Sequence, residues 1–402
     1  MLSVPEARER ILDGVFPLPA EVVALTDACG RVSAAPVISR LSNPPADVSS
    51  MDGYAVRAAD LSAQGTRLTC IGSAPAGHPF AGQVGPGECV RIFTGAVVPT
   101  GADAILIQEN AQAEGKSVTT TTTLASGTYI RRKGQDFAEG QDIIPAGRRL
   151  SARDIGLAAA ANHPWLQVTR RPRVAIAATG DELLLPGSGL GTGQIANSNT
   201  PMLAALLRAA GAEPVMLPVL RDDMADLATL ERMVEGVDML LTAGGASVGS
   251  HDLVRRGLEQ VGLKTDFWKI AMRPGRPLMY GHLGRLPFIG LPGNPVAAFV
   301  CSVVFVLPAL RRMAGLAMPV MPPEHAVLGA DVPENDRRMD HLRARLDHDG
   351  NGRLVATPFP VQDSAMLHVL AESAALVLRA PNAPPAKAGD PCEIIRIDRV
   401  LE

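Results

Sequence analysis

The sequence predicts a multidomain protein of class α/β plus β, and three observations lead to this prediction. The chain has 402 residues, well beyond the ~250–300 at which one hydrophobic core stops growing. Its middle part, from Arg173 to Leu310, alternates short apolar strands with helices. The parts before and after it hold many short β segments divided by Gly and Pro. We therefore expect an α/β domain joined to β-rich domains.

The composition is that of a globular protein without a general affinity for nucleic acid or membranes. Hydrophobic residues make up 47% of the chain, charged residues make up 20%, and the formal net charge is -3. The five cysteines include no CxxC pair, which argues against a disulfide framework or a zinc site and fits a reducing cytosol. The N-terminus lacks the apolar core of a signal peptide, and the longest apolar run, Val296–Leu310, is too short to span a bilayer. We expect a cytoplasmic protein.

The first part of the chain is expected to hold two helical stretches around a β-rich insertion. Val4 to Ala35 should be mainly helical, and Arg153–Ala161 should form a helix that packs with it. Between them, the predicted strands are Val90–Thr94, Ala104–Gln108 and Val118–Thr123.

The α/β pattern begins at Arg173. The expected strands are Val174–Ala177, Val215–Val219, Met239–Thr242 and Pro287–Leu291. The expected helices are Pro201–Ala210, Met224–Val234, the segment after Asp252, and Val296–Leu310. This alternation predicts a parallel sheet with helices on both faces. Prolines at positions 319, 322 and 323 mark a linker to a β-rich tail.

A glycine-rich turn between a strand and a helix is the first candidate binding element. The residues of this turn are Gly244, Gly245, Ser247, Gly249 and Asp252. Free backbone N–H groups in such a turn can bind a phosphate. The turn by itself is equally compatible with a plain connection between the two elements.

Carboxylates follow two neighbouring strands and should meet this turn at the carboxyl edge of the sheet. Thr179-Gly180-Asp181-Glu182 follows one strand, and Arg221-Asp222-Asp223 follows another. Carboxylates beside a phosphate-binding turn suggest Mg²⁺ held between protein and phosphate oxygens, with Asp181, Glu182 and Asp222 as candidate ligands. Helix capping would explain any one of these side chains taken alone.

A basic segment and a rigid elbow add two further candidates. Lys269, Arg273 and Arg276 fall within eight positions stiffened by Pro274 and Pro277, which suits an oxyanion or a polyphosphate. A solvated basic face is the alternative. The segment GLPGNPV, with Pro292 and Asn294, leads into the longest apolar run and predicts a helix N-terminus directed at an anion.

Several of these segments form an ordered series with others in the chain. The series reads SSMDGYAV, RIFTGAVVPTGADAI, RRKGQD, ATGDEL with NSN downstream, TAGGASVGSHD, AMRPGRP and GLPGNPV. In this order and over nearly the full length, the chain closely resembles the molybdopterin molybdenumtransferase family, known as MoeA and represented in animals by the C-terminal domain of gephyrin. ATGDEL and GGASVG are shared with the wider molybdenum-cofactor superfamily, whereas SSMDGYAV and GLPGNPV are more specific.

The resemblance implies an elongated homodimer whose chain has four parts. A discontinuous helical linker domain would span residues 1–40 and 137–170, and an inserted β-rich domain residues 41–136. A three-layer α/β/α molybdopterin-binding domain would span residues 171–320, and a C-terminal β-barrel residues 321–402. The implied reaction is Mg²⁺-dependent cleavage of adenylylated molybdopterin (molybdopterin-AMP), with insertion of molybdate into the dithiolene and release of AMP and molybdenum cofactor. Possible protein partners are the adenylyltransferase of the pathway and the recipient molybdoenzymes.

The resemblance also assigns roles to individual residues. The catalytic set is Asp52, Asp136, Glu182, Asp222, Asp252 and Lys269. The substrate-binding set is Thr94, Thr179, Gly180, Gly244, Gly245, Ser247, Gly249, Arg273, Arg276, Pro277, Pro292, Asn294, Arg338, Arg343 and Ser364. Asp52 and Thr94 are expected to reach the α/β domain of the second subunit. We infer that some carboxylates hold Mg²⁺ and position water, because cleaving a phosphoanhydride depends on charge neutralisation.

The chain departs from the family pattern at several of these positions. Arg273 and Arg276 stand where many members have Lys, and Ala297 stands where many have Ser. The family's Gly-Ser-Gly-rich turn reads Gln362-Asp363-Ser364-Ala365, and Asp340-His341 replaces an acidic–aromatic pair.

Two other functions are compatible with the α/β motifs. One is a molybdopterin adenylyltransferase or CinA-like pyrophosphatase, which would need neither the early β domain nor the barrel. The other is a non-catalytic dimeric scaffold, against which the retained carboxylates argue. Which adenylate the protein consumes would distinguish these functions from the transferase. The sequence does not determine a preference for molybdate or tungstate.

Overall fold

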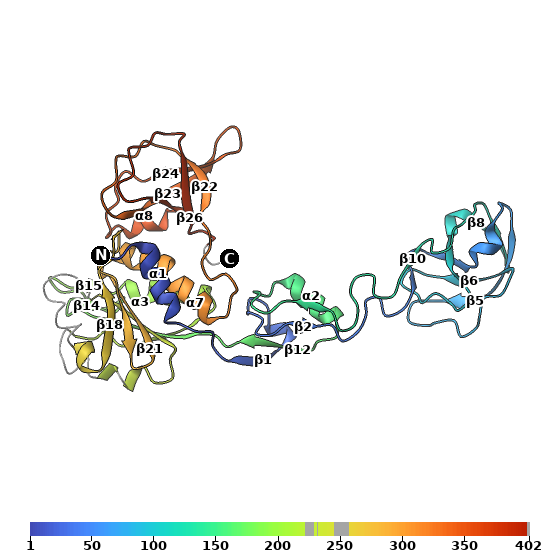
Figure 1. The fold of residues 1–402 in the computed structure, drawn as a ribbon, viewed down its shortest axis with the longest axis horizontal. Helices are drawn as coiled ribbons and strands as arrows, with labels where there is room; N and C mark the ends of the chain where they lie inside the picture. Colours follow the sequence, from blue (N-terminus) through green and yellow to red (C-terminus); the bar gives the residue numbers. More distant parts are fainter. Residues whose placement is uncertain (222–228, 231, 245–256, 400–402) are drawn as a thin grey trace.

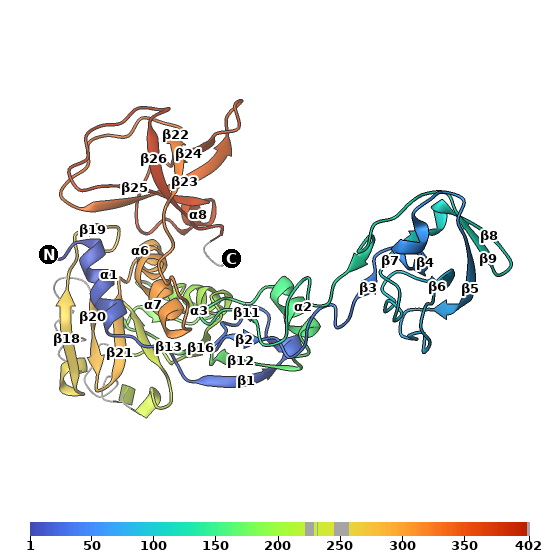
Figure 2. The same cartoon turned by 45° about the vertical axis from the view of Figure 1, so that its right-hand side comes forward.

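The computed structural model describes residues 1–221, 229–230, 232–244 and 257–399. The molecule is elongated (Figures 1 and 2). A β-rich domain lies at one end, a thin linker occupies the middle, and an α/β body that carries a small barrel lies at the other end.

The N-terminal helix belongs to the α/β body. Helix α1 (Val4–Asp13) starts with a capping box formed by Ser3 and Glu6, and it ends at Gly14. Its buried residues Val4, Ala7 and Ile11 join the main core of the α/β body. The expectation of helix as far as Ala35 is wrong, because Gly14, Pro17 and Pro19 end the helix and the chain continues as a strand.

The linker is mostly β structure. Its strands are β1 (Ala20–Ala24), β2 (Val37–Ile38), β11 (Asp142–Ile144) and β12 (Trp165–Thr169), with β1 paired to β12 and β2 to β11. The helix expected at Arg153–Ala161 is α2 (Ala152–Ala160), capped by Ser151. It packs on β11 and on the short helix η1 (Leu25–Asp27), whereas we expected it to pack with the N-terminal helix.

The inserted domain is built on one sheet with the strand order β7-β4-β6-β5-β9-β8. The bounds are β4 (Gly53–Val56), β5 (Arg67–Ala74), β6 (Glu88–Ile92), β7 (Ala104–Ile107), β8 (Ala111–Glu114) and β9 (Ser117–Thr120). The three strands expected here are confirmed as β6, β7 and β9. Short elements complete the domain, namely β3 (Val48–Ser49), β10 (Ile130–Arg131), η2 (Ala58–Leu61) and η3 (Gln108–Asn110).

The α/β body has a mixed sheet with the order β16-β13-β17-β21-β20-β18. Its strands are β13 (Arg173–Ala178), β16 (Glu213–Met216), β17 (Met239–Ala243), β18 (Leu263–Trp268), β20 (Met279–Leu283) and β21 (Leu286–Leu291). The first four strands in that order are parallel, but β20 and β18 are antiparallel to their neighbours. We expected only parallel strands. The two-residue turn Gly284-Arg285 between β20 and β21 permits only a hairpin.

Apolar cores cover both faces of this sheet. One face packs against α1, α3 (Asn199–Ala209), α6 (Pro295–Cys301) and α7 (Leu307–Met313). The other face packs against Leu230, Val234 and Leu258. The described part of the chain holds one helix apolar and long enough to cross a membrane, Pro295–Met313, and 83% of its apolar window is buried inside the protein. A π-helical turn, η4 (Ser302–Val306), precedes Pro308 and lets this helix continue.

The C-terminal part is a closed barrel, as expected. Its strands are β22 (Glu324–Leu328), β23 (Met339–His348), β24 (Leu354–Pro358), β25 (Ala375–Arg379) and β26 (Pro391–Arg396), with the short helix α8 (Leu367–Ala371). The ladder runs β23-β24-β22-β26-β25 and returns to β23. Strand β19 (Met272–Arg273) of the α/β body pairs with the start of β23, which fixes the barrel to the body.

Candidate active site

The backbone segments that follow β13, β16 and β17 are joined at the carboxyl edge of the parallel strands. Thr179 follows β13 and donates its N–H to Ala243 O at 3.2 Å. Gly244 follows β17 and donates its N–H to Leu291 O at 3.3 Å. Gly180 bonds to Leu220, at the end of the segment after β16, at 3.2 Å. The backbone of this edge is therefore tied together strand by strand.

At Gly244 this edge is packed too closely for a side chain. Gly244 has φ +101°, and a Cβ there would lie 2.5 Å from Thr179 O. Gly180 has φ +146°, and a Cβ there would lie 2.7 Å from a carboxylate oxygen of Glu182. The Glu182 carboxylate therefore folds back over the Gly180 backbone, at the edge where ligands bind in open α/β sheets.

Replacing Gly244 with alanine should lower the free energy of unfolding by about 3 kcal/mol, because the new Cβ meets a backbone oxygen and the positive φ is strained. Gly293 provides a matched control, since its Cβ would meet nothing closer than 3.6 Å. Urea unfolding should leave the Gly293→Ala variant within ~0.5 kcal/mol of the wild type. Equal stability of the two variants would contradict the close packing described at Gly244.

Two buried polar atoms at this edge have no hydrogen-bond partner among the described residues. They are Thr179 Oγ1 and Asn199 Oδ1. The amide nitrogen of Asn199 donates to Gly293 O at 2.7 Å and so holds the elbow after β21. Asn199 belongs to the NSN motif but is not among the residues predicted for the site. Buried unpaired oxygens at a ligand-binding edge are acceptors for a bound group.

A cleft of about 510 Å³ lies between the α/β body and the barrel. It gathers many of the predicted substrate-binding residues, namely Arg273, Arg276, Pro277, Pro292, Asn294, Arg338 and Ser364. Asn294 donates to Ser364 Oγ at 2.7 Å, and Val296 N donates to Ser364 O at 3.1 Å. Ala297, where many relatives have Ser, also lines this body–barrel cleft.

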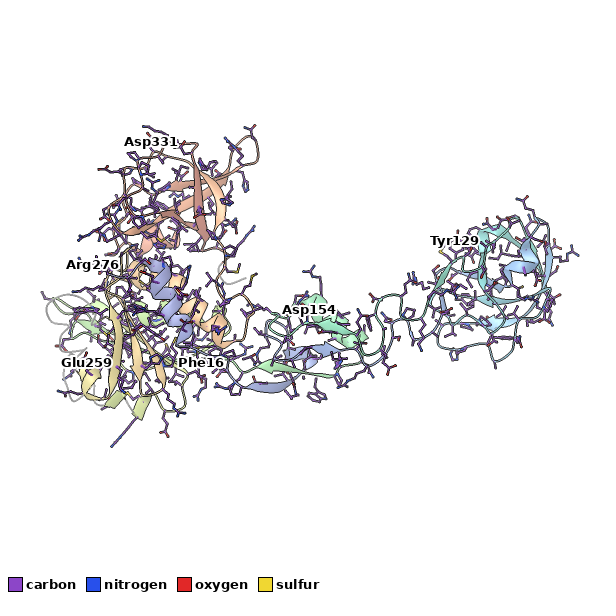
Figure 3. All side chains as sticks on the ribbon, in the orientation of Figure 1. Phe16, Tyr129, Asp154, Glu259, Arg276 and Asp331 are labelled. Atoms are coloured by element: carbon purple, nitrogen blue, oxygen red, sulfur yellow. The ribbon has the colours of Figure 1, made fainter. Side chains whose placement is uncertain are left out.

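Arg276 and Arg338 both line this cleft, but the charge of Arg338 is shared with Asp336. Arg276 is exposed, and no ion pair joins it to another described residue. In Figure 3 it lies where the α/β body meets the barrel. Arg338 forms an ion pair with Asp336 at 2.6 Å, and the bonds from Arg338 lower the pKa of Asp336 to about 2. A cleft with these two guanidiniums suits an oxyanion.

Arg273 lines the cleft, but its guanidinium binds Asp340 rather than the open space. Its Nε donates to Asp340 Oδ1 at 2.7 Å, and its Nη2 donates to Asp340 Oδ2. The bond to Asp340 raises the pKa of Arg273. The charge of Arg273 is thus compensated across the joint between body and barrel, and its role as an oxyanion ligand stays a prediction.

Arg343 is buried and lies away from the cleft lining. Its side chain is 1% exposed and does not line the cleft. Its Nε donates to Gln362 Oε1 at 3.3 Å and its Nη1 to Met366 O at 3.4 Å, so it supports the turn that carries Ser364. Burial lowers its pKa.

His341, next to Asp340, makes the barrel sensitive to acid. Its side chain is 2% exposed, and burial lowers its pKa from 6.5 to about 4. Between these values the unfolded chain binds a proton that the folded chain does not, so stability falls as the pH falls. When the pH is lowered from 7 to 5, the titration of His341 should lower the free energy of unfolding by about 2 kcal/mol.

Replacing His341 with phenylalanine should remove that part of the pH dependence. Urea unfolding at the two pH values measures it. The exposed His348, on the same strand, is the control, and its replacement should leave the wild-type dependence unchanged. A His341→Phe variant that still loses the same stability at pH 5 would show that other groups are responsible.

Lys269 lies apart from the cleft. Its backbone has φ +76°, and its ammonium group lies 3.9 Å from the centre of the Trp268 ring, a cation–π contact. The predicted cluster of three cations is thus divided. Arg276 faces the cleft, Arg273 binds Asp340, and Lys269 stacks on an aromatic ring.

Three predicted site residues lie in or near the inserted domain. Asp52 Oδ1 accepts hydrogen bonds from Thr94 N at 2.7 Å and from Thr94 Oγ1 at 2.8 Å, and these bonds lower the pKa of Asp52. Asp136 accepts a bond from Asn43 Nδ2 at 3.1 Å. Figure 3 shows the inserted domain, marked by Tyr129, at the opposite end of the molecule from Arg276. Within one chain, Asp52 and Thr94 are therefore far from the cleft.

The remaining predicted residues fall into two groups, one outside the described residues and one exposed. Asp222, Asp223, Gly245, Ser247, Gly249 and Asp252 lie outside the described residues. Asp181 and Glu182 are exposed. Among the residues that the structure describes, no three His, Cys, Asp or Glu side chains are grouped closely enough to hold a metal ion.

Family models match nearly the whole chain in three segments. The MoeA N-terminal region (domain I and II) matches residues 2–162, the probable molybdopterin binding domain matches residues 175–312, and the MoeA C-terminal region (domain IV) matches residues 325–397. Two solved structures of the molybdopterin biosynthesis MoeA protein from Pyrococcus horikoshii superpose with TM-scores of 0.87 and 0.85. They are 28% and 27% identical, and each alignment covers 98% of this chain and 99% of the other.

Three curated relatives carry the name molybdopterin molybdenumtransferase. The protein from Haemophilus influenzae is 31% identical over 405 residues, and the alignment covers 100% of both chains. A Mycobacterium tuberculosis protein, with the number 2 added to that name, is 37% identical over 87% of this chain and 88% of its own. A Nostoc protein is 39% identical over 74% of this chain and 70% of its own. On this evidence, and with the multidomain fold that it shares, the chain belongs to the molybdopterin molybdenumtransferase (MoeA) family.

Proposed function

We propose that this chain is an enzyme of molybdenum cofactor biosynthesis that cleaves molybdopterin-AMP and inserts molybdate into its dithiolene. The observation that best supports this is the body–barrel cleft, where Arg276, Arg338, Asn294 and Ser364 meet beside the glycine-rich edge. The Haemophilus influenzae relative named for this activity aligns over the whole of this chain. AMP and molybdenum cofactor are the products.

The residues divide into two neighbouring groups. The Thr179–Gly180 and Gly244 backbone, with the unpaired oxygens of Thr179 and Asn199, would hold the pterin phosphate end. Arg276 and Arg338 would bind molybdate and neutralise charge that develops on the phosphate oxygens. The Asn294–Ser364 bond would fix the floor of the cleft.

The side chains beside the edge suit Mg²⁺ in type. Asp181 and Glu182 offer exposed carboxylate oxygens, and Mg²⁺ usually binds one or two carboxylates together with substrate phosphates. Bound there with Asp222, the ion would neutralise phosphate charge. The protein groups would then hold the phosphoanhydride in one orientation for attack by water.

We further propose that the active unit is a homodimer in which Asp52 and Thr94 act on the cleft of the second subunit. Their pairing keeps the Asp52 carboxylate ionised and oriented. The linker holds them far from the cleft of their own chain (Figures 1 and 2), so they can contribute to a site only in trans. Asp136, at the junction between linker and inserted domain, would support this arm.

The two alternatives use less of the chain. An adenylyltransferase or CinA-like pyrophosphatase needs only the α/β body, whereas the family models extend over the inserted domain and the barrel. A scaffold without activity would not need the uncompensated charge of Arg276 in a cleft. The proposed reaction lies between an adenylyltransferase that supplies molybdopterin-AMP and the enzymes that receive the cofactor.

The test is to measure AMP release from molybdopterin-AMP with Mg²⁺, in the presence and absence of molybdate. We expect molybdate to stimulate AMP release and cofactor to form, and parallel assays with tungstate would establish the oxyanion preference. AMP release without metal insertion would attribute a lost function to Ala297 and the altered Ser364 turn. Consumption of molybdopterin and ATP instead would favour the adenylyltransferase, and no turnover by folded protein would favour the scaffold.

A further inference from the structure

A second cavity, of about 510 Å³, adjoins the body–barrel cleft, and most of its lining residues belong to the barrel. We call it the barrel cavity. Arg273, Pro274 and Gln362 line both this cavity and the cleft, so the two spaces are neighbours. A cavity of this size suits a small organic molecule. No role in the proposed reaction uses the rest of its lining.

Flat apolar side chains form much of the wall of the barrel cavity. They are Pro274, Pro333, Pro358, Phe359 and Pro360. The Phe359 side chain is half-buried, and the guanidinium of Arg345 lies 4.7 Å from the centre of its ring. Gln362 Nε2 donates to Phe359 O at 2.9 Å and so holds this segment in place. Such a wall suits a flat heterocycle, because its faces stack on aromatic side chains.

Two charged side chains of the lining have no oppositely charged partner among the described residues. Glu334 is exposed, and no hydrogen bond or ion pair joins its carboxylate to another described residue. Arg379 Nη2 donates to the backbone oxygens of Pro333, at 3.3 Å, and of Pro384. Asn335 Nδ2 donates to Arg379 O at 3.1 Å and so keeps the segment of Glu334 beside Arg379. The cavity therefore offers a carboxylate and a guanidinium to a ligand.

The other charges of the lining are compensated within the protein. Asp340 pairs with Arg273, and Asp331 pairs with Lys387 at 2.8 Å. His341 also lines the cavity, and its buried Nδ1 has no hydrogen-bond partner among the described residues. A buried polar atom that lacks a partner beside a cavity points to a bound group.

The order of groups along molybdopterin-AMP matches the order of these sites along the protein. In this substrate the dithiolene lies between the phosphate and the pterin ring. The glycine-rich edge, where we place the phosphate, meets the cleft at Gly293, since a Cβ there would lie 3.6 Å from Gly244 Cα. The cleft, where we place molybdate, holds the dithiolene. The pterin ring then extends beyond the cleft on the side away from the edge, which is the side of the barrel cavity.

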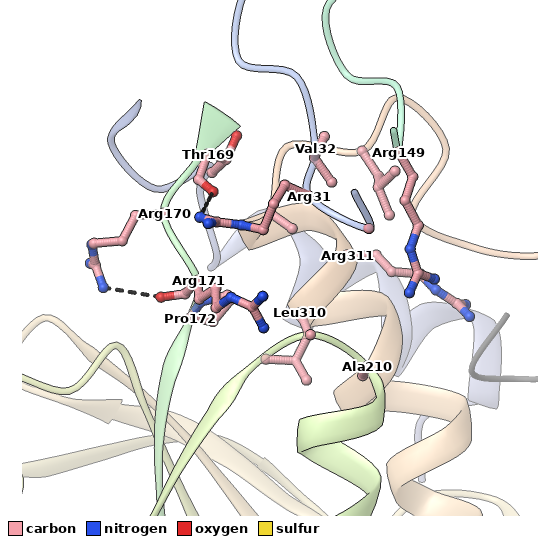
Figure 4. A pocket seen from close by; sticks show the side chains of 14 residues that line it. Arg31, Val32, Arg149, Thr169, Arg170, Arg171, Pro172, Ala210, Leu310 and Arg311 are labelled. Atoms are coloured by element: carbon pink, nitrogen blue, oxygen red, sulfur yellow. Dashed lines mark hydrogen bonds between the residues drawn. The ribbon is translucent and has the colours of Figure 1, made fainter. Parts of the chain in front are cut away.

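The cavity between the linker and the α/β body is too small for this ring (Figure 4). Its volume is about 60 Å³, roughly twice the ~30 Å³ share of one water. Arg31 and Arg170, which line it, donate to the backbone oxygens of Thr169 and Arg171 at 2.9 and 3.2 Å. These contacts support the junction itself.

We propose that the barrel cavity binds the pterin ring of molybdopterin-AMP, with the Glu334 carboxylate accepting hydrogen bonds from the ring's 2-amino group and N3–H. Arg379 donates to the neighbouring 4-oxo group. This assignment rests on the proposed function and adds where the ring of its substrate lies. A pterin offers two adjacent donors to a carboxylate, whereas adenine has an acceptor beside its amino group. Glu334 therefore determines which end of the substrate enters the barrel.

Fluorescence titration of the full chain with 6-hydroxymethylpterin tests the cavity without turnover. Glu334→Gln should weaken pterin binding about 10–100-fold, because hydrogen bonds to a charged group are lost. Glu393→Gln is the matched control and should bind like the wild type, because Glu393 is an exposed glutamate of the barrel that does not line the cavity. Adenosine should bind more weakly than the pterin, and its binding should not depend on Glu334.

Turnover of molybdopterin-AMP separates this inference from the proposed function. Glu334→Gln should raise KM about tenfold or more and change kcat little, because the lost bonds hold the substrate away from the reacting atoms. Wild-type turnover with an unchanged KM in the variant would overturn the inference and leave the function standing. Glu334-dependent pterin binding by a wild type that releases no AMP would do the reverse.

Three binding results would also overturn the inference. The wild type could fail to bind the pterin, Glu334→Gln could bind it equally well, or Glu393→Gln could lose binding to the same extent. Adenosine binding that depends on Glu334 would assign the cavity to the nucleotide end instead. Thermal unfolding confirms that each variant folds, and Phe359→Leu, which removes the stacking ring, serves as a second variant if Glu334→Gln does not.

Discussion

Replacing Arg273 with alanine should lower the free energy of unfolding by about 2–4 kcal/mol, the largest stability effect that we expect from one side chain at the cleft. Asp340, its partner, is buried with 4% of its side chain exposed. The substitution leaves that carboxylate buried without its cation. Because Arg273 is 48% exposed, the effect should stay below that of a fully buried pair. Urea unfolding of the full chain measures it.

Arg276 is the natural control, three positions along the chain. Its replacement by alanine should leave stability within ~0.5 kcal/mol while reducing turnover about 10²–10³-fold. The double variant Arg273→Ala/Asp340→Ala should recover part of the lost stability, since no charge is left unpaired. A stable Arg273→Ala variant with low activity would instead show that Arg273 serves the ligand rather than the joint.

Heterodimers should show that catalysis crosses between subunits, which is the largest effect on activity that we expect. Asp52→Ala and Arg276→Ala homodimers should each lose about 10²–10³-fold of the wild-type rate. A heterodimer with one substitution in each chain keeps one complete site, formed by the intact cleft of one chain and the intact Asp52 of the other. Purified through two different tags, it should regain about half of the wild-type activity.

The reciprocal heterodimer reverses the outcome. Here both substitutions lie in one chain and the other chain is wild type. If Asp52 acts in trans, each site holds one substitution and the heterodimer should be nearly inactive. If Asp52 acts in cis, the wild-type chain keeps a complete site and about half of the activity remains. The two heterodimers thus give opposite results under the two arrangements.

Local sequence patterns predicted most of the elements correctly. The apolar runs at Val174–Ala177 and Met239–Thr242 became strands of the central sheet, and the helix predicted at Pro201–Ala210 is α3. These patterns work because a buried strand or an amphipathic helix shows its period within a few residues. The N-terminal segment is an exception, because its mixture of charged and apolar residues predicts helix beyond the prolines that follow α1.

The topology depended on information that a local pattern does not contain. The apolar residues of β20 are equally compatible with a parallel and an antiparallel strand. The short turn at Gly284-Arg285 makes it antiparallel to β21. The domain on which α1 packs could not be predicted from the local pattern either. Its apolar face could have packed on either domain, and the larger core of the α/β body contains it.

The candidate site likewise has features that the sequence predicts and features that only the folded structure shows. The sequence by itself determined which residues have the right chemistry, because glycines, arginines and carboxylates in recognisable motifs survive as a linear pattern. It thereby predicted Thr179, Gly180, Gly244 and several residues that line the cleft. Only the tertiary structure decided which of the cations pair with a carboxylate. Arg273 and Asp340 are 67 positions apart, and their pairing arises from the β19–β23 contact. Arg343 faces inward because of its place on β23. The residue type alone determines whether a side chain can carry a charge. Its partner and its exposure depend on folding, because folding brings together segments that are distant in the sequence.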